Sequence, residues 1–550
     1  MKIDVNENNI VLDFEYNPVV IKFVKENFDG RKFRKKNKDW VIPKHHIVEI
    51  VEKLKKLDFK ITRKAFEEYK QRKRVEKNLK NIKKGDFSEE DEKILEKTKL
   101  PLYDYQKKGA LFMYKNESAL LGDEPGLGKT IQSLSVTEMR EAEKILIICP
   151  ASLKLNWKDE IEKWYDDPKI IVIDGRKEKR DELWKEEAKY HIMNYELLIR
   201  DLEEIKENEW DFIIADEATR IKNPKAKQSK AIKKIDAKYR LALTGTPLSN
   251  NTQDIWNIMD FCKPEILGNY WMFQSKYCIK NRFGGIEGYK NLDRLREVLS
   301  THMIRREKNK VLDELPPKTY TTRYVELSQE ERKVYNAIKE DIKDEIKEYG
   351  VEEGKGISNV LVKMVRLKQV TDYPGLISDC NKSSKMNTLK ELLEDIMYGN
   401  SKAIIFSQFS QITDIMMEEL SEYDPLLISG KVDKPKRKEN NDKFQNNDKN
   451  RLMIMTEAGG FGLNLQKAEY IIHYDLPWSI AKKEQREGRA HRIGQKNNLT
   501  VFDIVTENTI DEHVARILKK KQKISDKILG ENKSAEKAKF SYEDVKKILF

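Results

Sequence analysis

The stretch Asp123-Glu-Pro-Gly-Leu-Gly-Lys-Thr130 decides how this chain folds and what it binds. It follows the apolar segment Ser118–Leu121 and leads into a helix-like run that starts at Thr130. A glycine-rich turn between a strand and a helix points successive backbone N–H groups at a phosphate, and the helix N-terminus adds partial positive charge. The pattern therefore predicts a triphosphate-binding loop in an α/β domain. The alternative is a glycine-rich connection between a strand and a helix that binds nothing.

The loop residues have expected places around the nucleotide. Lys129 would reach the terminal phosphates, and the hydroxyl of Thr130 would hold Mg²⁺. The strict pattern opens with glycine, whereas Asp123 stands at that position here. The loop residues expected to bind the nucleotide are Asp123, Glu124, Pro125, Gly126, Leu127, Gly128, Lys129 and Thr130.

Two adjacent carboxylates follow a second apolar run, residues 212–215. Such a run bounded by polar residues fits a buried parallel strand, so Asp216 and Glu217 would emerge at its carboxyl end, where open α/β sheets bind ligands. Asp216 suits the Mg²⁺ shell, and Glu217 suits orienting and deprotonating the attacking water. A solvated turn is the ordinary alternative, but a phosphate loop on the same chain favours the catalytic interpretation.

The composition is that of a soluble, heavily charged globular protein. Of 550 residues 36% are charged, and no apolar run approaches the roughly 18 residues that span a bilayer. The N-terminus lacks the apolar core of a signal peptide, so we expect no export. The net charge of +12 weakly favours a polyanionic partner. The cysteines are scattered, which argues against zinc fingers and a disulfide framework and suits a reducing compartment.

Residues 1–85 are predicted to form a small α+β domain, with a helix starting at Asn17-Pro18. Basic residues, among them Arg34, cluster around Phe33 and Trp40. Because cations can grip a nucleic-acid backbone while aromatic rings stack on bases, Arg34 and Trp40 are candidates for DNA binding. An equally good alternative is a lysine-rich surface loop with Trp40 in a minor core. Short strands are expected at residues 3–5, 10–14, 40–43 and 59–62.

After a linker at residues 86–100, apolar strands alternate with amphipathic helices, which implies parallel sheets with crossover helices. We expect one α/β lobe at residues 101–320 with a helical insertion at about 253–315. A second is expected at 321–525 with a helical insertion at about 326–400, followed by a basic helical tail at 526–550. Only the first lobe has a phosphate loop, so the nucleotide is expected to be shared by both lobes. The expected strands are residues 145–149, 170–173, 212–215, 239–243, 403–406, 426–428, 452–455, 470–474 and 501–504.

Taken in order, the motifs resemble those of superfamily-two helicase motors, specifically the Swi/Snf-type ATPases that translocate on double-stranded DNA. The resemblance covers about residues 101–525 and implies two tandem RecA-like domains. Leu102-Tyr-Asp-Tyr-Gln106 resembles the motif whose glutamine reads adenine. Several segments of the first lobe resemble family motifs that contact the DNA backbone. The resemblance assigns such contacts to Ser152, Lys154, Trp157, Asn194 and Thr246.

The second lobe carries the remaining motifs of this family. The strongest is Gln485-Arg-Glu-Gly-Arg489-Ala-His-Arg492-Ile-Gly-Gln495, which separates the Swi/Snf-type branch from RNA-unwinding relatives. Arg489 and Arg492 are three residues apart, so on a helix they would share a face and meet the γ-phosphate, with Gln485 in the same catalytic group. A salt-bridged surface helix is the alternative, because glutamates are close by. The resemblance also assigns Ser407, Thr456 and Trp478 to DNA and Gly462 to the nucleotide.

The sequence departs from the family pattern in places. Pro125 stands where many members have Met and should stiffen the turn. Thr219 replaces the His that often ends the Asp-Glu-Ala-His box. That His links nucleotide state to DNA grip in the family, so Thr219 puts the strength of coupling in question and leaves the hydrolytic residues intact. The N-terminal unit resembles the HepA-related-protein domain of annealing helicases through Phe14, Lys22, Arg31, Phe33, Trp40 and Pro43.

The resemblance implies an ATP- and Mg²⁺-dependent translocase that acts on duplex or forked DNA, or on proteins bound to it. We expect a monomer without membrane association, located in the cytoplasm, with the nucleoid in a prokaryote or phage, or in a eukaryotic nucleus. The alternatives are a motor of the RapA kind that recycles RNA polymerase, an RNA helicase, and a DNA-binding scaffold without turnover.

Overall fold

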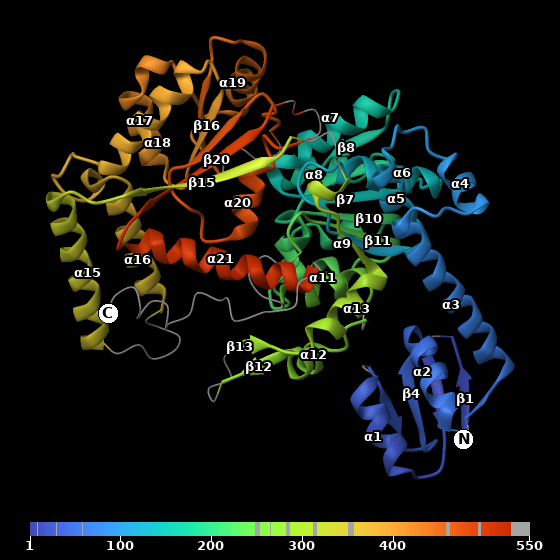
Figure 1. Cartoon of the computed structure of the whole chain (residues 1–550). Helices are drawn as coiled ribbons and strands as arrows, with labels where there is room; N and C mark the ends of the chain where they lie inside the picture. The colour runs from blue at the N-terminus through green and yellow to red at the C-terminus, as the bar shows by residue number, and fades with distance from the viewer. Residues whose placement is uncertain are drawn as a thin grey trace. The chain divides into compact units, whose positions relative to one another are not determined.

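The structure, a computed structural model, describes residues 1–529 except 8, 29, 58, 248–252, 265, 282–285, 312–315, 350–356, 458–462, 493, 494 and 496. The chain divides into two compact units (Figure 1). The first consists of Met1–Asp123 and Gly128–Arg306, and the second of Glu124–Leu127 and the chain from Glu307 onward. Each unit has its own sheets and its own buried core.

The first unit begins with a small α+β domain. Its sheet has the strand order β3-β4-β2-β1-β5, antiparallel apart from the parallel pair of β1 and β5. Helix α1 begins as predicted, because the Asn17 side chain accepts hydrogen bonds from the N–H groups of Val19 and Val20 and Pro18 occupies the first turn. The elements are β1 (Lys2–Val5), β2 (Asn9–Asp13), α1 (Pro18–Asn27), β3 (Lys32–Arg34), β4 (Asp39–Pro43), α2 (Ile47–Leu54) and β5 (Lys60–Ile61).

Two helices lead from this domain to the next sheet. Helix α3 (Arg63–Lys84) ends at Gly85, whose left-handed conformation closes it. Helix α4 (Glu89–Leu95) begins with a capping box between Ser88 and Asp91. Its Ile94, like Leu100 beyond it, is buried in the core of the following sheet. Residues 86–100 are therefore packed rather than the predicted linker, because their few apolar side chains face inward.

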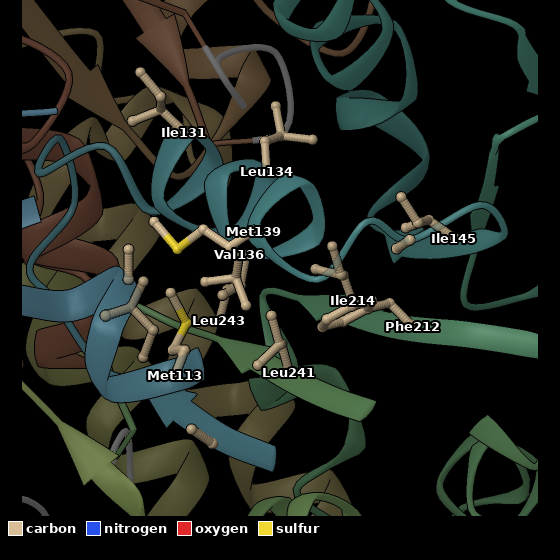
Figure 2. Close-up of a cluster of buried hydrophobic side chains, with 14 of the residues drawn as sticks. Met113, Ile131, Leu134, Val136, Met139, Ile145, Phe212, Ile214, Leu241 and Leu243 are labelled. Carbon is tan, nitrogen blue, oxygen red and sulfur yellow. The ribbon is translucent and has the colours of Figure 1, made fainter. Parts of the chain in front are cut away.

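A parallel sheet follows, with the strand order β14-β6-β11-β10-β7-β9-β8. Strands β7 and β9 are buried at every position, as expected for parallel strands that helices cover on both faces. Figure 2 shows part of this core, where Val136 and Met139 of helix α6 (Lys129–Met139) lie on the side of the helix that faces strand residues Leu241 and Leu243. The strands are β6 (Ser118–Leu121), β7 (Ile145–Cys149), β8 (Ile170–Val172), β9 (Tyr190–Asn194), β10 (Trp210–Asp216), β11 (Ala237–Leu243) and β14 (Met303–Ile304).

The insertion expected to be helical contains strands as well. A hairpin of β12 (Cys278–Lys280) and β13 (Ile286–Tyr289) interrupts it, and β14 joins the sheet beside β6. Strands this short give no periodic pattern that the sequence could reveal. The other helices of the first unit are α5 (Asp104–Asn116), α7 (Lys154–Trp164), α8 (Lys177–Leu183), α9 (Leu202–Lys206), α10 (Lys227–Ile232), α11 (Asp254–Cys262), α12 (Tyr270–Tyr277) and α13 (Leu292–His302).

The second unit holds another parallel sheet, with the strand order β15-β20-β19-β16-β18-β17. The lobe boundary expected at residue 320 falls inside β15, which pairs with β20 along its whole length. The division lies instead between Arg306 and Glu307. Strand β15 escaped prediction because it is a largely polar, exposed edge strand. The strands are β15 (Lys318–Val325), β16 (Ala403–Ser407), β17 (Leu426–Ile428), β18 (Leu452–Thr456), β19 (Tyr470–His473) and β20 (Leu499–Thr506).

A buried ion-pair cluster joins three helices of the second unit. Lys385 lies 2.8 Å from Asp372 and 2.5 Å from Asp511, and all three side chains are buried. The tail predicted at residues 526–550 begins inside helix α21, and its part beyond Leu529 lies outside the described residues. The helices are α14 (Lys308–Val311), α15 (Gln329–Tyr349), α16 (Ile357–Asp372), α17 (Ser384–Tyr398), α18 (Ser410–Glu419), α19 (Lys434–Asn446), α20 (Ile480–Glu487) and α21 (Ile510–Leu529).

The predicted fold class is confirmed: two tandem α/β, RecA-like domains with parallel sheets follow a small α+β domain. The expected strands of both lobes are present and differ only at their ends. Within the described residues, no helix combines the length and the apolar character needed to cross a membrane.

Candidate functional site

The glycine-rich loop lies between β6 and α6, as predicted. Gly126 has a φ of 93° and Gly128 a φ of 71°, left-handed conformations that glycine adopts without strain. Gly128 caps α6, so Lys129 and Thr130 stand in its first turn, where backbone N–H groups lack partners inside the helix. The loop leaves the carboxyl end of β6, which pairs with β11 and β14. The turn before Gly128 is formed by Glu124, Pro125, Gly126 and Leu127.

Lys129 and Gln106 both lie against the loop. The Lys129 ammonium donates to the main-chain oxygen of Asp123, 2.9 Å away, which holds it at the turn. Gln106 of α5 is buried, and its Oε1 accepts the N–H of Tyr103 at 3.0 Å. A Cβ on Gly128 would come within 2.5 Å of the Gln106 Nε2. The glutamine is therefore packed beside the loop, which agrees with its expected place near the nucleotide.

Asp123, where the strict pattern has glycine, is a buried anchor. Its Oδ1 accepts the main-chain N–H of Arg306 at 3.0 Å and the Nε–H at 2.9 Å, and its Oδ2 pairs with Nη2 of the same guanidinium. Gln132 donates to Oδ2 at 3.1 Å, and Arg306 also donates to the Tyr105 carbonyl. A side chain on Gly109 would overlap Gln132 and Arg306. The Asp123 carboxylate is thus bonded to residues of its own unit, and its contact with a nucleotide stays a prediction.

Asp216 and Glu217 stand at the carboxyl end of β10, as predicted. Burial raises the pKa of Asp216, while a hydrogen bond from Trp157 and the charge of Lys129 act to lower it. The Asp216 Oδ1 accepts the N–H of Glu217 at 2.9 Å. Glu217 has a φ of 49° and a ψ of 52°, a left-handed conformation that is strained for a residue with a side chain. The negative carboxylate suits Mg²⁺, and Lys129 in the first turn of α6 suits the negative phosphates. The two groups together therefore fit a Mg²⁺–triphosphate.

Two side chains expected to touch DNA point into the first unit instead. Lys154 is buried, with its Nζ 3.2 Å from the Ile173 carbonyl and 2.9 Å from the Asp174 carboxylate. Trp157 is 2% exposed, and its indole N–H donates to Asp216 Oδ2 at 2.9 Å. Direct contact of these two side chains with DNA is therefore not supported, because helix α7 turns them toward the sheet.

The other predicted DNA contacts of the first unit lie at the ends of elements. Ser152 is half-buried in the turn (Ala151–Leu153) before α7. Asn194 ends β9 and donates to the Glu196 carboxylate at 2.6 Å. Thr246 follows β11 and is buried. Strands β7, β9 and β11 are parallel, so these residues share one edge of the sheet, and their contact with DNA stays a prediction.

In the second unit Ser407 is part of a buried polar network. Its hydroxyl donates to Asp475 Oδ2 at 2.6 Å, and Asp475 also accepts the main-chain N–H of Gln408 at 2.8 Å. Burial opposes ionisation of Asp475, but Lys368 and Arg486 lower its pKa to about 2. The ionised carboxylate therefore fixes the Ser407–Gln408 turn at the end of β16.

Other predicted residues of the second unit occupy different settings. Thr456 ends β18 beside Ser407 at the end of β16. Trp478 is half-buried, and the Lys368 ammonium lies 5.6 Å from the centre of its ring. Gly462 lies outside the described residues. The contacts of these residues with DNA or nucleotide remain predictions.

The arginine motif differs from its predicted geometry. Helix α20 ends at Glu487 with Gly488 as its cap, so Arg489 and Arg492 lie in the turns that follow. The prediction that they share a helix face is wrong, because glycine is a poor helix residue and the helix stops there. Arg489 is buried, and Arg492 donates to the carbonyl of Leu463 at 3.5 Å. Gln485 remains on the helix and is half-buried.

Two further residues of this motif were not predicted. Arg486 is buried and donates to the Asp475 carbonyl at 2.9 Å and to the Glu457 carboxylate at 3.0 Å. Glu487 is also buried and accepts from Lys318 at 2.9 Å and from Tyr320 at 2.7 Å. Burial opposes ionisation of Glu487, but Lys318 lowers its pKa. The surface-helix alternative is therefore wrong for this side of α20.

The β3–β4 hairpin carries the basic cluster of the N-terminal domain. It has features of both interpretations of its sequence, a nucleic-acid-binding surface and a surface loop with Trp40 in a minor core. Phe33 of β3 pairs with Trp40 of β4, with ring centres 5.3 Å apart. Phe33 is 48% exposed, whereas Trp40 packs against the small core. Arg34 donates from Nε to Asp39 at 2.8 Å. DNA binding by Arg34 and Trp40 stays a prediction.

Comparisons with known proteins agree with these motifs. The family descriptions "SNF2-related domain" and "Helicase conserved C-terminal domain" match residues 105–376 and 384–494. "Uncharacterized ATP-dependent helicase MG018" of Mycoplasma genitalium is 33% identical over 81% of this chain and 44% of its own length. The "ISWI chromatin-remodeling complex ATPase ISW1" of Saccharomyces cerevisiae is 30% identical over 80% of this chain and 41% of its own length.

A solved structure is similar as well. The SWI2/SNF2 ATPase core of Sulfolobus solfataricus in complex with dsDNA is 31% identical over 78% of this chain and 93% of that chain, with a TM-score of 0.39. The chain spans less than half the length of the two curated relatives. The phosphate loop, the Asp-Glu pair and the two arginines all fall within the matched residues. The chain therefore belongs to the SNF2-related (Swi2/Snf2) family of helicase-like ATPases.

Proposed function

We propose that this chain is an ATP-driven motor that translocates on double-stranded DNA. The observation that carries the proposal is a glycine turn, Lys129 and the half-buried Asp216 carboxylate at one edge of a parallel sheet. Membership of the SNF2-related family adds support. The second parallel sheet favours a two-part motor over a lone nucleotide-binding domain.

The residues proposed to bind ATP and Mg²⁺ each have a separate role. Lys129 and the first turn of α6 would hold the terminal phosphates, and Gln106 would contact the adenine from its place beside Gly128. Thr130 and Asp216 would hold Mg²⁺, which when bound withdraws charge from the phosphate oxygens.

The remaining catalytic roles are proposed for Glu217 and for three residues of the arginine motif. Glu217 would orient the attacking water and take its proton. We assign Gln485, Arg489 and Arg492 to the negative charge that develops on the γ-phosphate during hydrolysis. All three lie within residues matched by the helicase C-terminal family description.

Replacing Lys129 by Ala tests the site. We expect Lys129→Ala to abolish ATP hydrolysis and to leave duplex-DNA affinity unchanged, because the ammonium lies at the phosphate loop and is not among the residues assigned to DNA. Lys107→Ala is the matched control, since Lys107 is a partly exposed lysine of α5 whose ion pair with the exposed Asp104 is expected to contribute little stability. Hydrolysis at the wild-type rate by Lys129→Ala would show that the site is wrongly assigned.

The nucleic-acid substrate is tested by ATPase rates with duplex, forked and single-stranded DNA and with RNA. We expect duplex or forked DNA to stimulate most, and stimulation to fall with salt because phosphate contacts release counterions. Stimulation by RNA alone would point to an RNA helicase, and capture of RNA polymerase would point to a recycling motor. We further propose that the N-terminal domain recognises DNA structure and that the protein acts as a monomer in the compartment that holds DNA.

A further inference from the structure

Asp216 is held from two sides by residues that the reaction itself does not use. The Trp157 indole N–H donates to its Oδ2 at 2.9 Å, and the Tyr195 hydroxyl donates to its main-chain oxygen at 2.7 Å. Trp157 is 2% exposed and Tyr195 is 1% exposed. The other carboxylate oxygen accepts the N–H of Glu217. The strand end, and the direction in which its carboxylate points, are therefore fixed by these neighbours.

Both side chains come from segments whose motifs predict contact with DNA. Trp157 ends the segment Pro150–Trp157, and Tyr195 lies within Met193–Glu196. Helix α7 exposes Leu155 and Asn156 while Trp157 faces inward, so one helix presents a surface to solvent and a hydrogen-bond donor to Asp216. A shift of α7 would necessarily move that donor relative to the carboxylate.

A partner of this kind has a known effect on a metal ligand. A hydrogen bond that orients a ligating carboxylate contributes to metal affinity, and its loss typically costs about 10–100-fold in affinity or activity. Thr219 replaces the residue through which the family's Asp-Glu-Ala-His box couples the two sites. The contacts to Asp216 offer a second physical connection that needs no His.

We propose that Trp157 and Tyr195 are positioning residues that transmit DNA engagement at helix α7 and at the Met193–Glu196 segment to Asp216. The proposal rests on the proposed function, because it requires that this chain binds DNA. The link to Asp216 rests on the two hydrogen bonds from Trp157 and Tyr195. Trp157 sets the orientation of the carboxylate, and Tyr195 sets the position of its backbone. Both act on hydrolysis through Asp216 and touch neither nucleotide nor DNA themselves.

The test is Trp157→Phe, which keeps the aromatic ring and removes the N–H. Helix α7 offers a matched control in Trp164→Phe, because Trp164 also donates its indole N–H to a carboxylate, that of Glu160, at 2.9 Å. One measurement is binding of the fluorescent nucleotide mant-ADP as a function of Mg²⁺ concentration without DNA. The others are the fold stimulation of ATPase by duplex DNA and the affinity for that DNA.

We expect Trp157→Phe to require about tenfold more Mg²⁺ for half-maximal nucleotide binding, in line with the loss of a ligand-orienting hydrogen bond. We also expect the stimulation by DNA to fall several-fold while DNA affinity stays at the wild-type value. Tyr195→Phe should lower stimulation with a smaller change in Mg²⁺ requirement, because it frees the backbone and keeps the carboxylate bonded. Trp164→Phe should behave as the wild type in every measurement.

Wild-type Mg²⁺ requirement and wild-type stimulation in Trp157→Phe would overturn the proposal. An equal loss in Trp164→Phe would also overturn it, because the effect would then belong to the helix and not to Asp216. If Trp157→Phe failed to fold, Tyr195→Phe would decide the question by the same readouts. Absence of DNA stimulation in the wild type would instead refute the proposed function, while the Mg²⁺ measurement would still judge the role of Trp157.

Discussion

The phosphate loop begins on a residue that is fixed by a buried ion pair. Arg306 grips Asp123 with its main-chain N–H and its guanidinium together. It is also the last residue of the first unit, and the chain passes into the second unit at Glu307. The start of the loop is therefore tied to the point where the chain leaves the first unit, which makes Arg306 a candidate for holding the loop in its binding shape.

Arg306→Gln should raise the KM for ATP and destabilise the first unit. A buried carboxylate that loses its cation costs about 3–5 kcal/mol of unfolding free energy. Asp123→Asn combined with Arg306→Gln should recover most of that stability, because no uncompensated charge is left. Urea unfolding and ATPase kinetics provide the measurements.

The control for this prediction is Arg294→Gln. Arg294 lies 3.7 Å from Glu49 in a partly exposed ion pair, which is expected to contribute at most about 1 kcal/mol. A double variant that is no more stable than Arg306→Gln alone would contradict the account, since it would mean that the charge of Asp123 is not what Arg306 balances.

At the scale of the element, the β3–β4 hairpin carries the clearest exposed cations of the N-terminal domain. Replacing its exposed lysines, Lys32, Lys35, Lys36 and Lys38, by Gln should weaken binding to forked DNA and flatten its salt dependence. Each lost phosphate contact reduces the slope of log K against log salt by roughly 0.7–0.9. Fluorescence anisotropy at several salt concentrations measures both quantities.

The control replaces exposed lysines of the same domain that lie away from the hairpin: Lys25, Lys53, Lys55 and Lys60. It removes the same charge and should leave a larger part of the salt dependence intact. Equal effects of the two sets would show that only net charge matters and would remove the hairpin from the binding surface.

The elements also show where sequence reasoning succeeds and where it stops. Local patterns predict most strands of both sheets, the phosphate loop and the Asp216-Glu217 pair. Apolar runs and glycine turns can be recognised from a few neighbouring residues. Strand β15 has no such run, and α20 stops at Gly488 in a stretch whose charges suggest a longer helix. Local patterns likewise cannot show that Arg306, 183 residues from Asp123, completes the loop.

Trp157 illustrates a second kind of limit. Its motif predicts a role for the segment in DNA binding, but a motif cannot tell which side of a helix faces the sheet. Only the packing of α7 shows that the indole lies against Asp216 and that its neighbour Leu155 is exposed. Short motifs therefore name the candidate residues, and the structure supplies the hydrogen bonds between them.

At the scale of the whole molecule, buried neutral histidines make the fold sensitive to acid. Burial, together with nearby Arg72 and Lys263, lowers the pKa of His302 to about 3, and burial with Lys144 lowers the pKa of His191 to about 4. The unfolded chain binds protons below about pH 6.5, where the folded chain does not, so acidification favours unfolding. Each histidine should cost up to about 1.4 kcal/mol per pH unit below 6.5.

Urea unfolding of the first unit at pH 7 and pH 5 measures this loss. His302→Asn should reduce it, because the asparagine cannot take up a proton in the unfolded chain. The wild type at pH 7 serves as reference for the intrinsic cost of the substitution. Parallel losses in the wild type and in His302→Asn would show that His302 does not contribute to acid sensitivity.

The left-handed backbone of Glu217 has a consequence for laboratory evolution of this protein. A side chain in that conformation costs on the order of 1 kcal/mol, which glycine or asparagine would largely avoid. A library selected for heat resistance alone should therefore accumulate glycine or asparagine at this position and lose turnover as it gains stability. At this residue, substitutions that raise thermal stability are expected to lower ATPase activity. Only a selection for both properties would keep the glutamate.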